Sequence, residues 1–203
     1  MSELERSPSG RKLNLRARAL RQSQTRQRIT QAALELHQQR GPLHTTITEI
    51  AQRAGVERLT VYRHFPDETS LHQACQQHFF ASHPLPNLAL WREVPTFSNR
   101  IQLGLSELYE YWDQTHQMFS SVLRDHAVDP ERSGAGVVKF MSLACEALLD
   151  GEDVSGHPRQ LQRALVGHAV HFYTWRSLVQ EEGLSKKDAV KVMCQMILSA
   201  RTE

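Results

Sequence analysis

The residues best suited to chemistry lie close together, between positions 46 and 64. Their guanidinium, hydroxyl, carboxylate and imidazole groups are the donors and acceptors that bind phosphate oxygens and base edges; the clearest are Glu57, Arg58, Thr60, Arg63 and His64. The sequence contains no G-x-S-x-G, H-E-x-x-H, P-loop or G-x-G-x-x-G pattern. This stretch therefore indicates recognition of a partner, and we expect the chain not to be an enzyme.

One pattern resembles a metal site, His72-x-x-Cys75-x-x-His78. On a helix its two steps of three residues spread the side chains over about 120°, which suits one ion poorly. His168 and His171 share a helical face, but no cysteine or carboxylate is placed to join them. We therefore expect neither a metal nor a cofactor.

The charge of the chain is unevenly distributed. Residues 1–65 hold 12 Lys and Arg against 5 Asp and Glu, whereas residues 66–203 hold 12 against 17. The excess of positive charge in residues 1–65, beside an acidic remainder, favours a polyanionic partner for this first part of the chain. The three cysteines are widely separated, which suits free thiols in the cytoplasm. The sequence has no apolar run long enough to span a membrane and no apolar leader, so we expect a cytoplasmic protein that does not enter a membrane.

Helical patterns cover the first part of the chain. We expect residues 1–24 to form a basic, largely disordered arm, and a helix to begin at Thr25 and stop at Gly41-Pro42. Thr46 and Glu49 form a capping box for the next helix, which ends at Gly55. A third helix runs to Phe65, and Asp67 caps a fourth.

Two short helices joined by a glycine turn form the layout of a helix-turn-helix between Thr46 and Phe65. Small residues Ala51 and Ala54 allow the helices to pack closely, and Val61 and Phe65 can face inward. The polar residues named above would then face a DNA groove.

The second part of the chain is also predicted to be helical, with a boundary at the prolines of residues 83–87. We expect helices from about Ser98, over 137–149, over 157–182 and over 185–201, with Ser185 and Asp188 capping the last. The fold class is therefore all-α with about nine helices. The domains are expected to cover residues 25–82 and 88–203.

The stretch from Thr25-Arg26 through Ala33-Leu34-Glu35-Leu36, Thr45-Thr46, Ala54-Gly55-Val56 and Thr60-Val61-Tyr62-Arg63-His64-Phe65-Pro66 resembles the DNA-binding domain of the tetracycline-repressor family. The resemblance covers roughly residues 25–75. It implies a three-helix DNA-binding domain followed by a helical domain for ligand binding and dimerisation.

The resemblance also implies roles for matching positions. Arg58 would bind a guanine and Leu59 would pack on a thymine methyl. Phosphate or base-edge contacts would fall to the remaining candidates Thr46, Thr48, Thr60, Tyr62, Arg63 and His64. The partner would be a palindromic double-stranded operator bound by a homodimer.

The chain departs from the family pattern near this site. Glu57 stands where a capping Ser is common, Leu59 where Gly is common, and Asp67 and Glu68 where a Lys often binds phosphate. The basic arm would compensate by lying along or inside the minor groove. Its candidate residues are Arg16, Arg18, Arg21, Arg26 and Arg28.

The resemblance implies two roles for the second domain, residues 88–203. A small-molecule effector would bind among aromatic residues, with Tyr109, Trp112, His116, Phe119, Phe140 and Phe172 as candidates, although such residues also suit a core. The last two long helices would pair with those of a second subunit, through Leu161, Leu165, His168, Trp175, Val192 and Met196, although these stripes also suit the interior of one subunit.

The sequence thus predicts a sequence-specific transcriptional regulator, most simply a dimeric repressor that an unknown effector releases from its operator. The alternative is an architectural protein that binds DNA through its basic arm without sequence preference and without an effector.

Overall fold

The computed structural model describes residues 8–152 and 157–200, all of whose regular structure is helical. The predicted all-α fold class is confirmed. The chain divides into two compact units, Met1–Ser82 and His83–Glu203. In the first unit the helices are α1 (Pro8–Arg40), the short η2 (Pro42–His44), α2 (Ile47–Ala54), α3 (Arg58–His64) and α4 (Glu68–Ser82).

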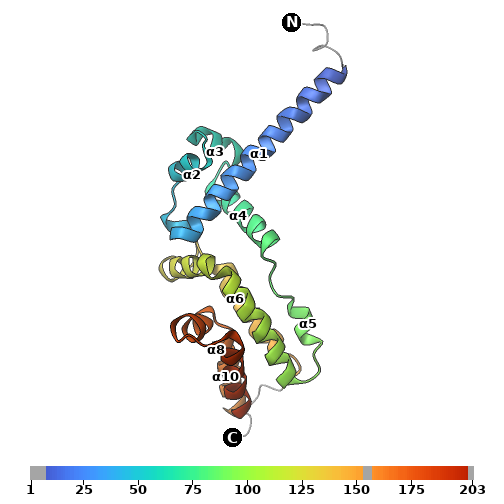
Figure 1. Ribbon diagram of the computed structural model, residues 1–203, viewed down its shortest axis with the longest axis vertical. Helices are drawn as coiled ribbons and strands as arrows, with labels where there is room; N and C mark the ends of the chain where they lie inside the picture. Colours follow the sequence, from blue (N-terminus) through green and yellow to red (C-terminus); the bar gives the residue numbers. More distant parts are fainter. Residues whose placement is uncertain (1–7, 153–156, 201–203) are drawn as a thin grey trace. The chain divides into compact units, whose positions relative to one another are not determined.

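The core of the first unit is the apolar stripe on the second half of α1. Ile29, Ala33 and Leu36 are almost fully buried, and α1 packs on both α2 and α4 (Figure 1). Gly41 ends α1 with φ of 91° and Gly55 ends α2 with φ of 63°, and both are left-handed conformations that favour glycine. These two stops direct the chain from α1 into the pair of short helices.

Helix α1 begins at Pro8, whereas the sequence analysis places its start at Thr25 after a largely disordered arm. Residues 1–7 lie outside the described part of the chain. From Arg11 to Arg40 there is no Gly or Pro, and most residues favour helix. Pro8 lies in the first turn, where no backbone donor is needed. The Thr25 hydroxyl donates to the Arg21 carbonyl at 2.9 Å, a bond made inside a helix.

The second unit contains the remaining helices. They are α5 (Leu88–Arg92), α6 (Phe97–Val128), α7 (Ala135–Leu148), α8 (His157–Val170), α9 (Phe172–Trp175), the π-helix η3 (Arg176–Glu181) and α10 (Lys186–Ser199). Ser185 caps α10 as predicted, because its side chain accepts from the Asp188 N–H. Helix α6 begins after Thr96 rather than at Ser98, and α5 is not among the predicted helices.

The single helix predicted over 157–182 is interrupted at His171. Its backbone is extended there, and the ring accepts a hydrogen bond from the Tyr173 N–H. The His168 carbonyl accepts from the His171 N–H at 3.1 Å and from the Thr174 hydroxyl at 2.6 Å, so it is satisfied at the interruption. The break lets Phe172 and Trp175 both enter the core, where each is 0% exposed. Burial of two large aromatic rings therefore outweighs the regular helix.

A histidine pair lies in the first unit between α1 and α4. His37 is only 8% exposed, and its ring centroid lies 6.4 Å from that of His72. Burial, assisted by the charge of His72, lowers the pKa of His37 to about 4. Burial also lowers the pKa of His72. Both histidines are therefore neutral in the folded unit near pH 7.

We predict that this unit loses stability as the pH falls from about 6.5 toward 4. In that pH range His37 binds a proton in the unfolded chain but not in the folded unit, so a falling pH favours unfolding. Between pH 7.5 and 5 the contribution of His37 to the free energy of unfolding should fall by about 2 kcal/mol. Urea unfolding at both pH values, followed by circular dichroism, measures the loss.

The matched variants are His37→Leu and His78→Gln. His37→Leu should lose about 2 kcal/mol less than the parent over the same range, because no proton binds at that position. His78 is exposed on α4, so His78→Gln should keep the pH dependence of the parent. An unchanged dependence in His37→Leu would contradict the assignment.

Candidate nucleic-acid interface

The start of α2 is fixed by the predicted capping box. The Thr46 hydroxyl accepts from the Glu49 N–H at 3.3 Å, and Glu49 Oε2 accepts from the Thr46 N–H at 2.9 Å. The hydrogen bonds that the Glu49 carboxylate accepts from the Thr46 N–H and the Thr46 hydroxyl hold its pKa below the ordinary value. Arg40 donates to Glu49 Oε1 at 2.7 Å, which ties the end of α1 to the same turn. Thr46 is thus first of all a helix cap, while Thr48, two residues further on, is exposed.

Helix α3 presents a divided surface. Its inward residues Val61 and Phe65 are 0% and 1% exposed, as the sequence predicts, whereas Leu59 is 66% exposed and Tyr62 39%. Arg58 and Arg63 are also exposed, and Thr60 and His64 are half-buried. The outer face of α3 therefore combines apolar, cationic and hydrogen-bonding groups.

Arg58 and Tyr62 are coupled on this face. Arg58 Nη2 donates to the Tyr62 hydroxyl at 3.2 Å, and the guanidinium carbon lies 5.6 Å from the centre of the Tyr62 ring. The four-residue spacing on one helix makes the contact possible. Glu57 precedes the helix without any side-chain cap, as its departure from the family pattern suggests. The first turn of α3 thus keeps backbone N–H groups for other partners.

Arg26 makes two contacts that its sequence pattern did not predict. Its guanidinium donates to the His64 carbonyl at the end of α3 and lies 4.0 Å from the centre of the Phe65 ring. Both contacts join α1 to α3 rather than leaving Arg26 free for DNA. The sequence signal is its spacing, because Arg26 precedes the buried Ile29 by one helical turn. Arg16, Arg18, Arg21 and Arg28, the other predicted arm residues, are exposed on α1.

Acidic residues follow α3. Asp67 Oδ1 accepts from the Ser70 N–H at 2.7 Å, which caps α4 as predicted, and Glu68 lies in the first turn of that helix. Both carboxylates stand where a phosphate-binding cation is common in the family that the sequence resembles. Their negative charge makes the start of α4 unattractive to DNA phosphates.

Comparison with known proteins agrees with this geometry. Residues 29–75 match the model of the family described as bacterial regulatory proteins, tetR family. This region of the chain, which contains α2 and α3, is therefore similar to the tetR family. The match begins at the first fully buried residue of α1 and ends within α4, so it covers the helices that hold α3. No curated protein matches the chain by sequence.

Two solved structures share the fold. A tetR-family transcriptional regulator from Streptomyces coelicolor is 22% identical, with a TM-score of 0.54, covering 89% of this chain and 80% of the other. A mutant of the HlyIIR protein is 14% identical, with a TM-score of 0.55, covering 86% of this chain and 95% of the other. The similarity extends over both units, so the tetR-type fold is not confined to the helix-turn-helix.

The aromatic residues predicted to line an effector pocket form a packed cluster in the second unit. The Trp112 ring lies 5.2 Å from Phe119, 6.3 Å from Phe140 and 5.6 Å from Phe172, between centroids. The Tyr109 hydroxyl donates to the Ala169 carbonyl at 3.1 Å. His116 is half-buried beside Trp175, with centroids 6.2 Å apart. These rings pack edge to face and fill the interior of the second unit.

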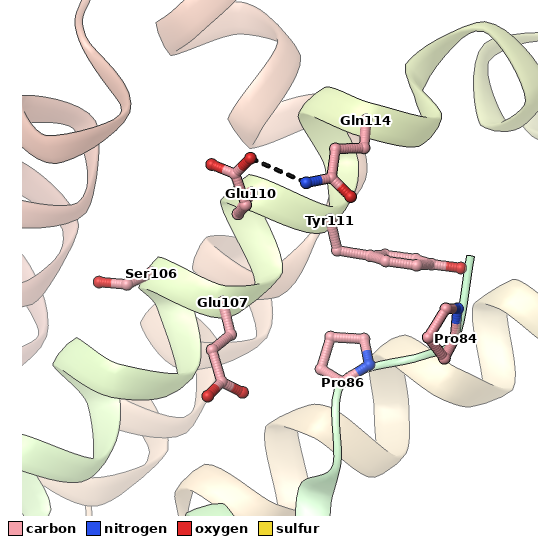
Figure 2. A pocket seen from close by; sticks show the side chains of 7 residues that line it. All are labelled: Pro84, Pro86, Ser106, Glu107, Glu110, Tyr111 and Gln114. Carbon is pink, nitrogen blue, oxygen red and sulfur yellow. Dashed lines mark hydrogen bonds between the residues drawn. The ribbon is translucent and has the colours of Figure 1, made fainter. Parts of the chain in front are cut away.

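A shallow pocket of about 440 Å³, largely open to solvent, lies beside α6 (Figure 2). Its lining is partly acidic and partly apolar, and consists of Pro84, Pro86, Ser106, Glu107, Glu110, Tyr111 and Gln114. The Tyr111 hydroxyl donates to the His83 carbonyl at 3.5 Å, which holds the first residues of the unit against α6. None of the six predicted pocket residues lines this open pocket.

The predicted dimer residues are divided between surface and core. Leu161, Val192 and Met196 are 44%, 37% and 43% exposed on α8 and α10, two helices that contact each other. His168 is exposed and Leu165 half-buried. Trp175 is fully buried, with its ring centroid 5.4 Å from that of Phe172, so it belongs to the core of its own subunit.

The described residues contain no group of three His, Cys, Asp or Glu side chains arranged to hold a metal. In the His72-x-x-Cys75-x-x-His78 pattern, the Cys75 thiol contacts the Thr30 carbonyl at 3.8 Å, and burial raises its pKa to about 12. A thiol that resists ionisation is a poor ligand. None of the helices over the described ranges has the length and apolar character needed to cross a membrane.

We predict that Arg26 acts by positioning α3. Arg26→Lys keeps the charge but loses the planar donor that reaches the His64 carbonyl and stacks on Phe65. It should therefore lower the free energy of unfolding nearly as much as Arg26→Ala, by about 0.5–1 kcal/mol. Thermal unfolding followed by circular dichroism measures both variants.

Arg28→Ala is the control, because Arg28 is exposed on the same helix and should leave the free energy of unfolding unchanged. A lysine variant as stable as the parent would show that only the positive charge at position 26 matters.

Proposed function

We propose that this DNA-binding transcriptional regulator is a cytoplasmic homodimeric repressor, which reads a palindromic operator with α3 of each subunit and leaves it when a small molecule binds. The observation that carries the DNA-reading part is the outer face of α3. It keeps Leu59 and Tyr62 exposed beside two arginines, while Val61 and Phe65 anchor the helix in the core. A helix so presented fits the major groove.

Specific roles follow from chemistry at each position. Arg58 in the first turn matches guanine, which offers two acceptors to a guanidinium, and Leu59 matches the methyl group of thymine. Tyr62 holds Arg58 through its hydroxyl, so it orients the base-reading side chain. We assign phosphate contacts to the other exposed or half-buried polar residues, Thr46, Thr48, Thr60, Arg63 and His64.

Dimerisation is supported by the exposed apolar residues of α8 and α10. Leu161, Val192 and Met196 are each more than a third exposed on helices that pack together. Apolar side chains on adjacent helices favour a helical bundle with a second subunit. A two-fold pair also doubles the short sequence that one α3 can read.

Release by an effector is supported by the shallow, open pocket of about 440 Å³ beside α6. Its volume is in the range of small-molecule sites, and its tyrosine, carboxylates and prolines offer both polar and apolar contacts. An occupant there would touch Pro84 and Pro86, which lie in the segment leading from one unit to the next. Binding would then alter how the subunit holds its DNA-binding helices.

Selection of bound sequences from a random duplex library, at near-physiological salt, tests the function. We expect a two-fold symmetric consensus whose half-sites lie about one helical turn apart. Enrichment of one symmetric sequence would support a dimeric, specific regulator. Equal affinity for all duplexes, with a steep dependence on salt, would instead support an architectural protein.

Arg58→Ala tests the assignment of base reading. It should cost about 1–3 kcal/mol of binding free energy and relax the preference at one position of each half-site. Arg63→Ala, also exposed on α3, is the control and should weaken all sequences alike. The measurement is the affinity of both variants for the consensus and its single-base variants. If Arg58→Ala discriminates as the parent does, another residue reads that base.

A further inference from the structure

We propose that the first half of α1, residues 8–25, is a helical extension that binds phosphates flanking the bases read by α3. We call it the α1 extension. The inference rests on the proposed function, because it needs α3 to be placed on an operator. It differs from a flexible arm, since its helical form sets where its charges lie and which groove can admit it.

The described side chains of the α1 extension cover no other part of their unit. From Asn14 to Gln24 no side chain is buried, and Leu15 and Leu20 are each 60% exposed. Figure 1 shows this part of α1, in dark blue, running on beyond α3 and α4. A helix that covers nothing in its own unit contributes little to the core. Its composition therefore reflects something other than folding.

The charges of the α1 extension have no counter-charges along the helix. Between Arg6 and Glu35 the sequence contains no Asp or Glu, while it contains seven Arg and Lys from position 11 to position 28. A solvated helix is usually supported by pairs of opposite charge four residues apart. Here neighbouring cations only repel one another, and phosphates are the polyanion that relieves this repulsion.

The helical form is maintained by its anchored half. Nucleation is the costly step in forming a helix, and here the packed stripe from Ile29 to Leu36 has already provided a nucleus. No Gly or Pro interrupts α1 between Arg11 and Arg40. Arg26, bound to the His64 carbonyl, fixes the rotation of α1 relative to α3. The direction of the α1 extension is therefore set by the domain that presents α3.

The helical register places arginines of the α1 extension on both sides of the face that contains Arg26. At about 100° per residue, Arg16 and Arg18 lie about 80° to either side of the face that contains Arg26. Both are exposed. Two rows of cations separated in this way suit two rows of phosphates, such as those that border a groove.

The width of the α1 extension determines which groove of DNA can admit it. A helix with its side chains is about 10–12 Å across, so it cannot enter a minor groove about 6 Å wide, but it fits a major groove about 12 Å wide or lies on the backbone. From Arg26 back to Pro8 the helix is roughly 27 Å long, at about 1.5 Å per residue. That length spans roughly eight base pairs.

Hydroxyl-radical footprinting of the full chain on its selected operator, with long flanks, tests the proposal. The parent should protect several base pairs beyond each half-site. The triple variant Arg16→Gln/Arg18→Gln/Arg21→Gln should lose this flanking protection and bind at least tenfold more weakly, while protection under α3 persists. The slope of log affinity against log salt should fall by about 0.9 for each phosphate that the variant no longer neutralises.

A second pair of variants tests the helical form while keeping every charge. Ala19→Pro breaks the helix within the α1 extension, whereas Ala19→Ser at the same exposed position preserves it. We expect flanking protection to disappear in Ala19→Pro and to remain in Ala19→Ser. Flanks protected equally in both variants would overturn the helical form and indicate a flexible arm.

The outcomes separate this proposal from the function on which it rests. Unchanged flanks and salt dependence in the triple variant, with protection under α3 intact, would overturn the α1 extension alone. A parent that protects no preferred sequence would overturn both proposals.

Discussion

The structure of the DNA-binding unit depends on burial of one apolar stripe of α1 against α2 and α4. Helices of eight and seven residues, the lengths of α2 and α3, are not stable by themselves in water. They persist because Ile50, Ala51, Val61 and Phe65 are buried on a surface that includes Ile29 and Leu36 of α1. The stripe thus stabilises the recognition helix without using its outer face.

That division explains why α3 tolerates an exposed leucine and a missing cap. Val61 and Phe65 supply the hydrophobic stabilisation of the helix, so Leu59, Arg58 and Tyr62 are free of any structural demand from the core. Arg26 compensates at the far end, where it satisfies the last carbonyl and stacks on Phe65.

Much of this unit could be predicted from the sequence because its signals are local. The capping box, Gly41, Gly55 and the inward Val61 and Phe65 each follow from spacing or backbone conformation within a few residues. The role of Arg26 could not be predicted in the same way, since its partners His64 and Phe65 lie on another helix and far along the chain. The start of α1 was misplaced for a different reason. Ser7-Pro8-Ser9-Gly10 suggests an irregular chain, but Pro8 and Gly10 are tolerated in a first turn.

In the second unit, periodicity alone was insufficient. The spacing from Leu161 to Val179 predicts one continuous helix with one apolar seam, yet the chain breaks at His171, which is neither Gly nor Pro. Residues far along the chain determine where the helix is interrupted, because Phe172 and Trp175 reach Trp112 and His116 of α6 only after the break. The same choice removes Trp175 from the surface and leaves Leu161 and Met196 exposed. In the proposed dimer, a second subunit would cover these exposed apolar side chains of α8 and α10.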